Sequence, residues 1–147
     1  MKDVTLNIAI GASVNSAVWT NKKIKWSELL EKLSHPVVTA ETMADYALML
    51  KPDRQKTKDV GGFVGGKLTN KRRSKGSVES RQIIALDADN AYEGLWWDFA
   101  MLYDCAACLH STHSSTQKSP RYRIIIPLDR PVSAEEYEAI SRKIASD

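Results

Sequence analysis

The chain has 147 residues, 43% of them hydrophobic, so it can bury one sizeable core, and we expect residues 1–147 to form a single domain. No apolar run approaches the length of a membrane span and no signal-like segment begins the chain, which excludes a membrane partner and favours a soluble, cytoplasmic protein. The formal net charge of +3 is too small to indicate a nucleic-acid-binding protein by itself.

The first part of the chain, residues 1–80, predicts a strand, two helices and a basic loop. Residues 4–13 alternate apolar side chains and predict a strand, whereas residues 19–25 carry turn residues and lysines. Ser27 offers an N-cap for a first helix that ends at His35. The apolar stripe of this helix consists of Leu29, Leu30 and Leu33.

A second helix is expected between Thr39, its N-cap, and a break at Pro52. Apolar residues recur there at helical spacing, and we expect them to be core residues. They are Met43, Tyr46, Ala47 and Leu50. Residues 51–80 are polar, basic and glycine-containing, which predicts a mobile hairpin or loop.

The sequence GGFVGGKL inside that loop is similar to a phosphate-binding P-loop. However, Lys67 is followed by Leu68, where a P-loop needs a serine or threonine to hold magnesium. No strand–loop–helix pattern surrounds it either. We therefore reject a P-loop nucleotide hydrolase.

Basic residues crowd the same loop, with no acidic residue between them. They are Lys67, Lys71, Arg72, Arg73 and Lys75. Such a cluster is expected to lie along nucleic-acid or nucleotide phosphates, and a solvated basic loop is the alternative.

Residues 81–90, RQIIALDADN, are an apolar run that ends in two aspartates. On a strand, alternate side chains share a face, so Asp87 and Asp89 lie side by side with Ile83 and away from Ile84. A close carboxylate pair repels itself unless a cation, a proton or a basic neighbour relieves it. The pair alone leaves open a divalent-metal site and a solvated turn.

The second part of the chain, residues 81–147, predicts a strand, a helix, a hairpin and a last helix. The helix covers residues 94–104, the hairpin strands cover 106–112 and 122–128, and Ser133 with Glu136 caps the last helix. The fold class is therefore α/β of the α+β kind, with a mixed or antiparallel central sheet and helices packed on one face. No stop signal precedes Asp147, so we expect a C-terminally truncated fragment of a longer protein.

The hairpin adds polar side chains to the aspartate face. A turn centred near Gln117 sets His113 opposite Arg121 and Ser111 opposite Arg123. The open face then presents Asp87, Asp89, Ser111, His113, Arg121 and Arg123. Carboxylates for metal beside a hydroxyl, an imidazole and guanidiniums for phosphate predict a nucleoside-triphosphate site.

The segment CAACLHSTH offers a zinc site as a competing interpretation, through Cys105, Cys108, His110 and His113. Structural zinc sites usually separate their two ligand pairs by a longer segment than the single Leu109 found here. No helix N-terminus follows the first cysteine as a redox motif requires. We disfavour both interpretations, and two cysteines so close together indicate a reducing compartment rather than a disulfide framework.

Several segments together resemble the archaeo-eukaryotic primase superfamily, most closely the primase-polymerase domains of phages, plasmids and genomic islands. They are LDAD after an apolar run, STH, and PRYRIIIPLDRPVSAEEY, together with WSELLEKLS, KDVGGFVGGKL and KRRSKGSV earlier in the chain. The resemblance covers nearly the whole chain, and the combined pattern is specific.

The resemblance implies a primase-polymerase-like fold and a nucleotidyltransferase, either a DNA primase or a DNA-directed polymerase. Its catalytic residues would be Asp87, Asp89 and His113, the two aspartates holding Mg²⁺ or Mn²⁺. Its nucleotide-binding residues would be Ser111, His113, Arg121 and Arg123. A third acid of the family normally lies further along than Asp147, and we assign none of Asp98, Asp104 and Asp129 to it.

The partners implied by the resemblance are a single-stranded DNA template, nucleoside triphosphates and a helicase domain or protein encoded downstream. The alternative function is a catalytically silent module that binds single-stranded DNA or an origin in a mobile-element replication initiator.

Overall fold

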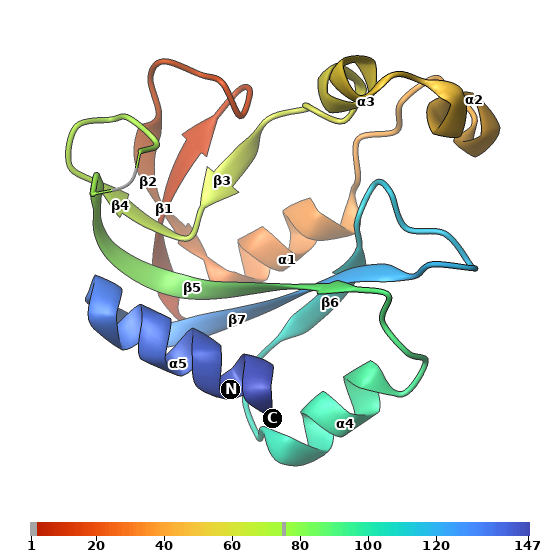
Figure 1. Cartoon of the computed structure of the whole chain (residues 1–147). Helices are drawn as coiled ribbons and strands as arrows, with labels where there is room; N and C mark the ends of the chain where they lie inside the picture. Colours follow the sequence, from red (N-terminus) through yellow and green to blue (C-terminus); the bar gives the residue numbers. More distant parts are fainter. Residues whose placement is uncertain (1–2, 75) are drawn as a thin grey trace.

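The structure, a computed structural model, describes residues 3–74 and 76–147. These residues form two antiparallel sheets and five helices, which confirms the predicted α/β class (Figure 1). The first sheet has the order β2-β1-β3, from β2 (Thr20–Lys25), β1 (Thr5–Gly11) and β3 (Gly62–Val64). The second has the order β4-β5-β7-β6, from β4 (Gly66–Leu68), β5 (Val78–Asp89), β7 (Arg121–Val132) and β6 (Cys108–Ser111).

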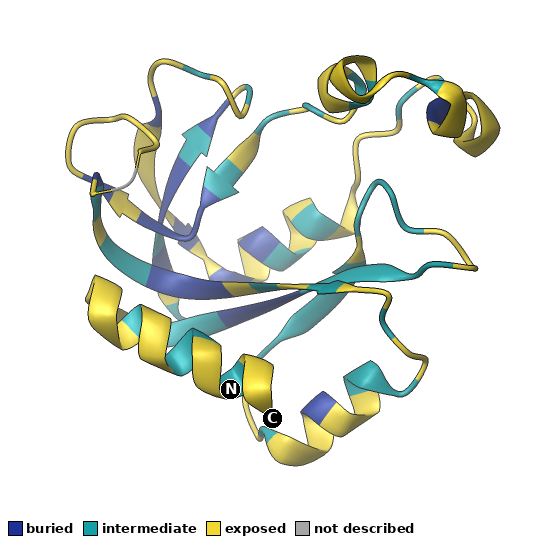
Figure 2. Ribbon diagram, viewed as in Figure 1, coloured by how far each residue is buried: buried dark blue, intermediate teal, exposed yellow. Residues whose placement is uncertain are grey.

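The helices cover the sheets on opposite sides. The core between the sheets joins α1 (Trp26–Ser34) and β1 to Ile83 of β5 and Ile125 of β7. On the other face of the second sheet, Ile84 and Ile124 pack against α4 (Leu95–Leu102) and α5 (Ala134–Ser146). Ile83 and Ile84 therefore face opposite sides of the sheet, as the alternation predicted for the acidic strand requires. Figure 2 shows the middle of β5 and β7 buried between these layers.

A buried glutamine joins the two sheets. Gln82 is only 3% exposed and lies where the β5–β7 register shifts. Its side-chain oxygen accepts hydrogen bonds from the backbone N–H and the side-chain amide of Asn7, both at 3.0 Å. Its side-chain nitrogen donates to Thr5 O at 3.1 Å and to Leu128 O at 3.4 Å. One buried amide thus forms hydrogen bonds with β1 and β7 together.

Residues 20–25 are a strand and not the turn that the sequence predicts. β2 pairs along the whole of β1, with Ile24 opposite Leu6 and its lysines directed to solvent. A lysine-rich edge strand resembles a turn in sequence because only one of its faces is buried. The following helix begins at Trp26, and Ser27 donates its hydroxyl to Asp3 instead of capping.

The expected second core helix is two short, exposed helices. α2 (Met43–Leu48) is capped by Thr42, not by Thr39, and buries only Tyr46. α3 (Lys51–Thr57) begins at the predicted break, because Pro52 sits in its first turn, where no hydrogen bond is lost. Both helices are mostly exposed (Figure 2). Leu50, expected in the core, is 72% exposed.

The glycine-containing segment forms two strands, which supports the rejection of a P-loop. β3 pairs with β1, and β4 pairs with β5. A side chain at Gly66 would place its Cβ 2.0 Å from Ser80 O, so this glycine permits close strand approach. The capping box of Ser133 and Glu136 at α5 is present as predicted. No helix in the described part of the chain is long and apolar enough to cross a membrane.

Replacing Gln82 by leucine is expected to lower the free energy of unfolding by about 1 to 3 kcal/mol, because the part-buried hydrogen bonds to Asn7, Thr5 and Leu128 are lost. Gln55→Leu, at an exposed position of α3, is the matched control. Urea unfolding of both variants measures the difference, and equal losses would contradict the role given to Gln82.

Candidate functional site

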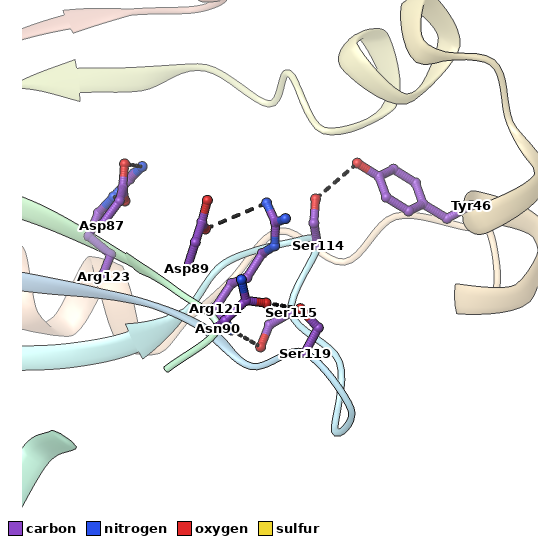
Figure 3. A network of polar contacts seen from close by, with 9 residues as sticks. All are labelled: Tyr46, Asp87, Asp89, Asn90, Ser114, Ser115, Ser119, Arg121 and Arg123. Carbon is purple, nitrogen blue, oxygen red and sulfur yellow. Dashed lines mark hydrogen bonds and ion pairs between the residues drawn. The ribbon is translucent and has the colours of Figure 1, made fainter. Parts of the chain in front are cut away.

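The open face of β5 and β7 carries two rows of paired charges. Asp87 lies opposite Arg123 and Asp89 lies opposite Arg121 in the strand register. Arg123 donates from Nε to Asp87 Oδ1 at 2.7 Å and from Nη2 to Oδ2 at 3.1 Å. Arg121 Nη1 lies 3.5 Å from Asp89 Oδ1 (Figure 3). The structure thus brings together four of the six residues predicted for this face.

The charged side chains lie on the same face of β5 and β7 as Ile83 and Ile125, which are buried. Ile83 and Ile125 pack beneath β1 and α1, and the strands then extend beyond that cover. The aspartates are 59% and 63% exposed, and the arginines are 42% and 41% exposed. The pairs are therefore accessible to a ligand from the solvent side.

The hairpin register differs by one residue from the prediction. Ser111 lies opposite Tyr122 and His110 lies opposite Arg123. This register places Leu109 opposite Ile124, on the face covered by α4 and α5. The predicted register would have put the apolar Leu109 among the charges and His110 in the core.

His110 therefore belongs to the charged face, which the sequence interpretation missed. It shares a transverse row with Arg123 and Asp87, one residue from each of β6, β7 and β5. The ring Nδ1 of His110 lies 2.9 Å from Ser111 O. Because a carbonyl only accepts, this contact requires the Nδ1–H tautomer of the ring.

His113 lies beyond the end of β6 and contacts a different part of the chain. Its Nε2 is 3.1 Å from Thr39 Oγ1 and 3.2 Å from Glu41 Oε1. The Tyr46 ring packs on the imidazole, with 4.6 Å between ring centroids. Tyr46 Oη also contacts Ser114 Oγ at 3.3 Å (Figure 3). The segment before and within α2 thus holds His113.

A broad cleft of ≈ 2020 Å³ connects these groups. Its lining includes both aspartates and both arginines, and also His110, Ser111 and His113. Gly61 to Gly65, from the other sheet, face the same space. The cleft is larger than a typical small-molecule pocket, so it has room for an extended ligand.

Of the predicted basic cluster, Arg73 lines this cleft. Lys67 pairs with Glu79 at 2.9 Å, and the Arg73 guanidinium lies 5.7 Å from the Trp19 ring centroid. The backbone N–H of Trp19 donates to Lys71 O at 2.7 Å, which fixes the loop to the first sheet. Arg72 is exposed, and Lys75 lies outside the described residues.

The donor set at the charged face suits a hard divalent cation. Magnesium is usually held by one or two carboxylates together with substrate phosphates. Asp87 and Asp89 provide two adjacent carboxylates. Both are exposed enough for a metal ion to replace the arginine as the partner of the carboxylate. Within residues 3–74 and 76–147 no cluster of three or more metal-ligating side chains occurs.

The cysteines and histidines of CAACLHSTH have separate surroundings. Cys108 packs against the core between the sheets, whereas Cys105 is exposed. His110 belongs to the charged face and His113 to the Glu41 contact. Burial raises the pKa of both thiols, the opposite of what a reactive thiolate needs.

The fold and this face define an α/β protein with paired acidic and basic side chains in an open cleft. Residues 1–147 match the family model described as the VapE N-terminal domain, and the chain belongs to that family. The family places the chain with replication-associated proteins of mobile elements. No curated protein and no solved structure was found to match it.

The exposed Asp87–Arg123 pair is expected to contribute less than about 1 kcal/mol to folding, because solvent screens both charges. A double-mutant cycle of Asp87→Asn and Arg123→Gln, followed by urea unfolding, measures the coupling free energy. A coupling above about 2 kcal/mol would assign the pair a structural role instead of a ligand-binding one.

Proposed function

We propose that this chain is a primase-polymerase domain that catalyses metal-dependent, template-directed nucleotidyl transfer during replication of a mobile element. The observation that carries the proposal is the pair of rows Asp87–Arg123 and Asp89–Arg121 on one accessible face. The primase resemblance of the sequence and the membership in the VapE N-terminal domain family support it.

The charge pairs suit a ligand that carries both negative and positive charge. Each guanidinium is matched to a carboxylate, so binding a phosphate alone would leave the aspartates without a partner. A nucleoside triphosphate with its divalent cation supplies phosphate oxygens to Arg121 and Arg123 and a cation to Asp87 and Asp89. When bound there, Mg²⁺ or Mn²⁺ would neutralise the triphosphate and activate a 3′-hydroxyl.

Further residues of the cleft position the triphosphate in this proposal. Arg123 and Arg121 provide planar guanidiniums that bind phosphate oxygens in pairs. His113 contacts a phosphate at the end of β6, and His110 adds a ring nitrogen beside Arg123. Ser111 lines the cleft but lies opposite Tyr122, so its phosphate contact stays a prediction.

The basic loop would bind the single-stranded template. Lys67, Lys71, Arg72 and Arg73 are all exposed, and Arg73 lines the cleft. The backbone N–H of Trp19 donates to Lys71 O, which holds the loop in place. Backbone binding of this kind is independent of base sequence and sensitive to salt. A helicase domain or protein acting with this one completes the proposed role.

Replacing Arg72 by glutamine is expected to reduce the salt dependence of oligonucleotide binding, because one phosphate contact is lost. The slope of log K against log salt should fall by about 0.7 for a single strand. Fluorescence anisotropy with a labelled oligonucleotide measures it. Lys143→Gln on α5 is the control, and equal slopes in the two variants would remove Arg72 from the interface.

The activity test is primer synthesis and extension on single-stranded DNA with Mg²⁺ or Mn²⁺, using the longest natural form of the protein. Asp87→Ala and Arg123→Ala are each expected to lower the rate more than about 100-fold, because charge stabilisation at the reacting phosphates is lost. Asp53→Ala, at an exposed position of α3, should retain the wild-type rate.

Two outcomes would contradict this assignment. Equal activity of Asp87→Ala and wild type would remove the aspartates from the chemistry. Binding of oligonucleotide without metal-dependent triphosphate binding would instead support a silent DNA-binding module.

A further inference from the structure

Of the two ring nitrogens of His113, only Nε2 is accessible to a ligand, and in this structure Nε2 contacts Glu41 and Thr39. The ring Nδ1 is buried and has no hydrogen-bond partner among the described residues. The ring Nε2 contacts Glu41 Oε1 at 3.2 Å and Thr39 Oγ1 at 3.1 Å. A phosphate can therefore reach His113 in this arrangement only at Nε2, where Glu41 already lies.

Glu41 is well placed to act as an anion at that position. Its carboxylate is only 13% exposed, and Oε1 accepts the Thr39 hydroxyl hydrogen at 2.5 Å. The Thr39 hydrogen bond lowers the pKa of the Glu41 carboxyl, so the group is ionised at neutral pH. An oxygen of a carboxylate and an oxygen of a phosphate offer the same acceptor to an imidazole N–H.

We propose that Glu41 occupies the place of a phosphate oxygen at His113, and that this internal anion sets the affinity of the cleft for triphosphate. The proposal rests on the proposed function, because it takes His113 as a triphosphate ligand. Binding the triphosphate then requires Glu41 to leave Nε2, and the like charge of Glu41 opposes the incoming phosphate until it does.

The segment that carries Glu41 is lightly attached, so it can move away from His113. Within α2 only Tyr46 is buried, and α3 has no buried residue. Leu48 and Leu50 are 86% and 72% exposed, so little apolar surface holds the segment down. Its contacts to the hairpin loop are those of Thr39 and Glu41 with His113 and of Tyr46 with His113 and Ser114.

The test compares the affinity of the protein for inorganic triphosphate with Mg²⁺, by calorimetric titration, in wild type and in Glu41→Gln. The variant is expected to bind about three- to tenfold more tightly, because a larger fraction of molecules has His113 free. The matched control is Glu31→Gln, which removes the same charge from the exposed Glu31–His35 pair on α1. Its affinity should equal that of wild type.

A Glu41→Gln variant that binds triphosphate no more tightly than wild type and Glu31→Gln do would overturn the proposal. A second measurement uses wild type alone. Triphosphate should increase amide hydrogen exchange over residues 39–46, since the segment loses its contact with His113. Unchanged or slower exchange there would also overturn the proposal.

Failure of this inference and failure of the proposed function give different results. If Arg123→Ala and His113→Ala weaken triphosphate binding but Glu41→Gln does not strengthen it, only the role of Glu41 is wrong. If wild type does not bind triphosphate, or binds it as well as Arg123→Ala does, both the function and the role of Glu41 are wrong.

Discussion

The buried side chain of Gln82 is the contact on which the arrangement of the two sheets depends. It lies at the shift in the β5–β7 register and bonds to Asn7, Thr5 and Leu128, so β1 is fixed across the second sheet. A single amide does this because it offers both donors and an acceptor in one plane. Asn21 makes a similar link at the other end, where its side chain bonds to both backbone groups of Leu68.

Local patterns in the sequence predicted the parts of the site that lie within one strand. The alternation along β5 and β7 placed Asp87, Asp89, Arg121 and Arg123 on one face, since side-chain direction on a strand depends only on residue parity. The hairpin register was not predictable in this way. It depends on burying Leu109 beneath α4 and α5, a tertiary contact that the loop length alone does not determine.

Two further differences have the same origin. The residues expected as a core helix have helical spacing, but only Tyr46 meets a packing partner, because nothing else covers α2. β2 was missed because its lysines outnumber its one buried residue, Ile24. For Glu41 no local signal exists, since it meets His113 across 72 positions of sequence, and only the fold brings the carboxylate to the imidazole.

The two charge rows also determine where the electrostatic field of the molecule originates. The carboxylates of Asp87 and Asp89 and the guanidiniums of Arg121 and Arg123 sum to zero, so at a distance their fields largely cancel. A polyanion approaching from solution is therefore steered by the exposed lysines and arginines of the basic loop and β2. In the proposed function, capture of a long polyanion would therefore depend on the basic loop and β2, whereas contacts with its phosphates in the cleft would depend on β5 and β7.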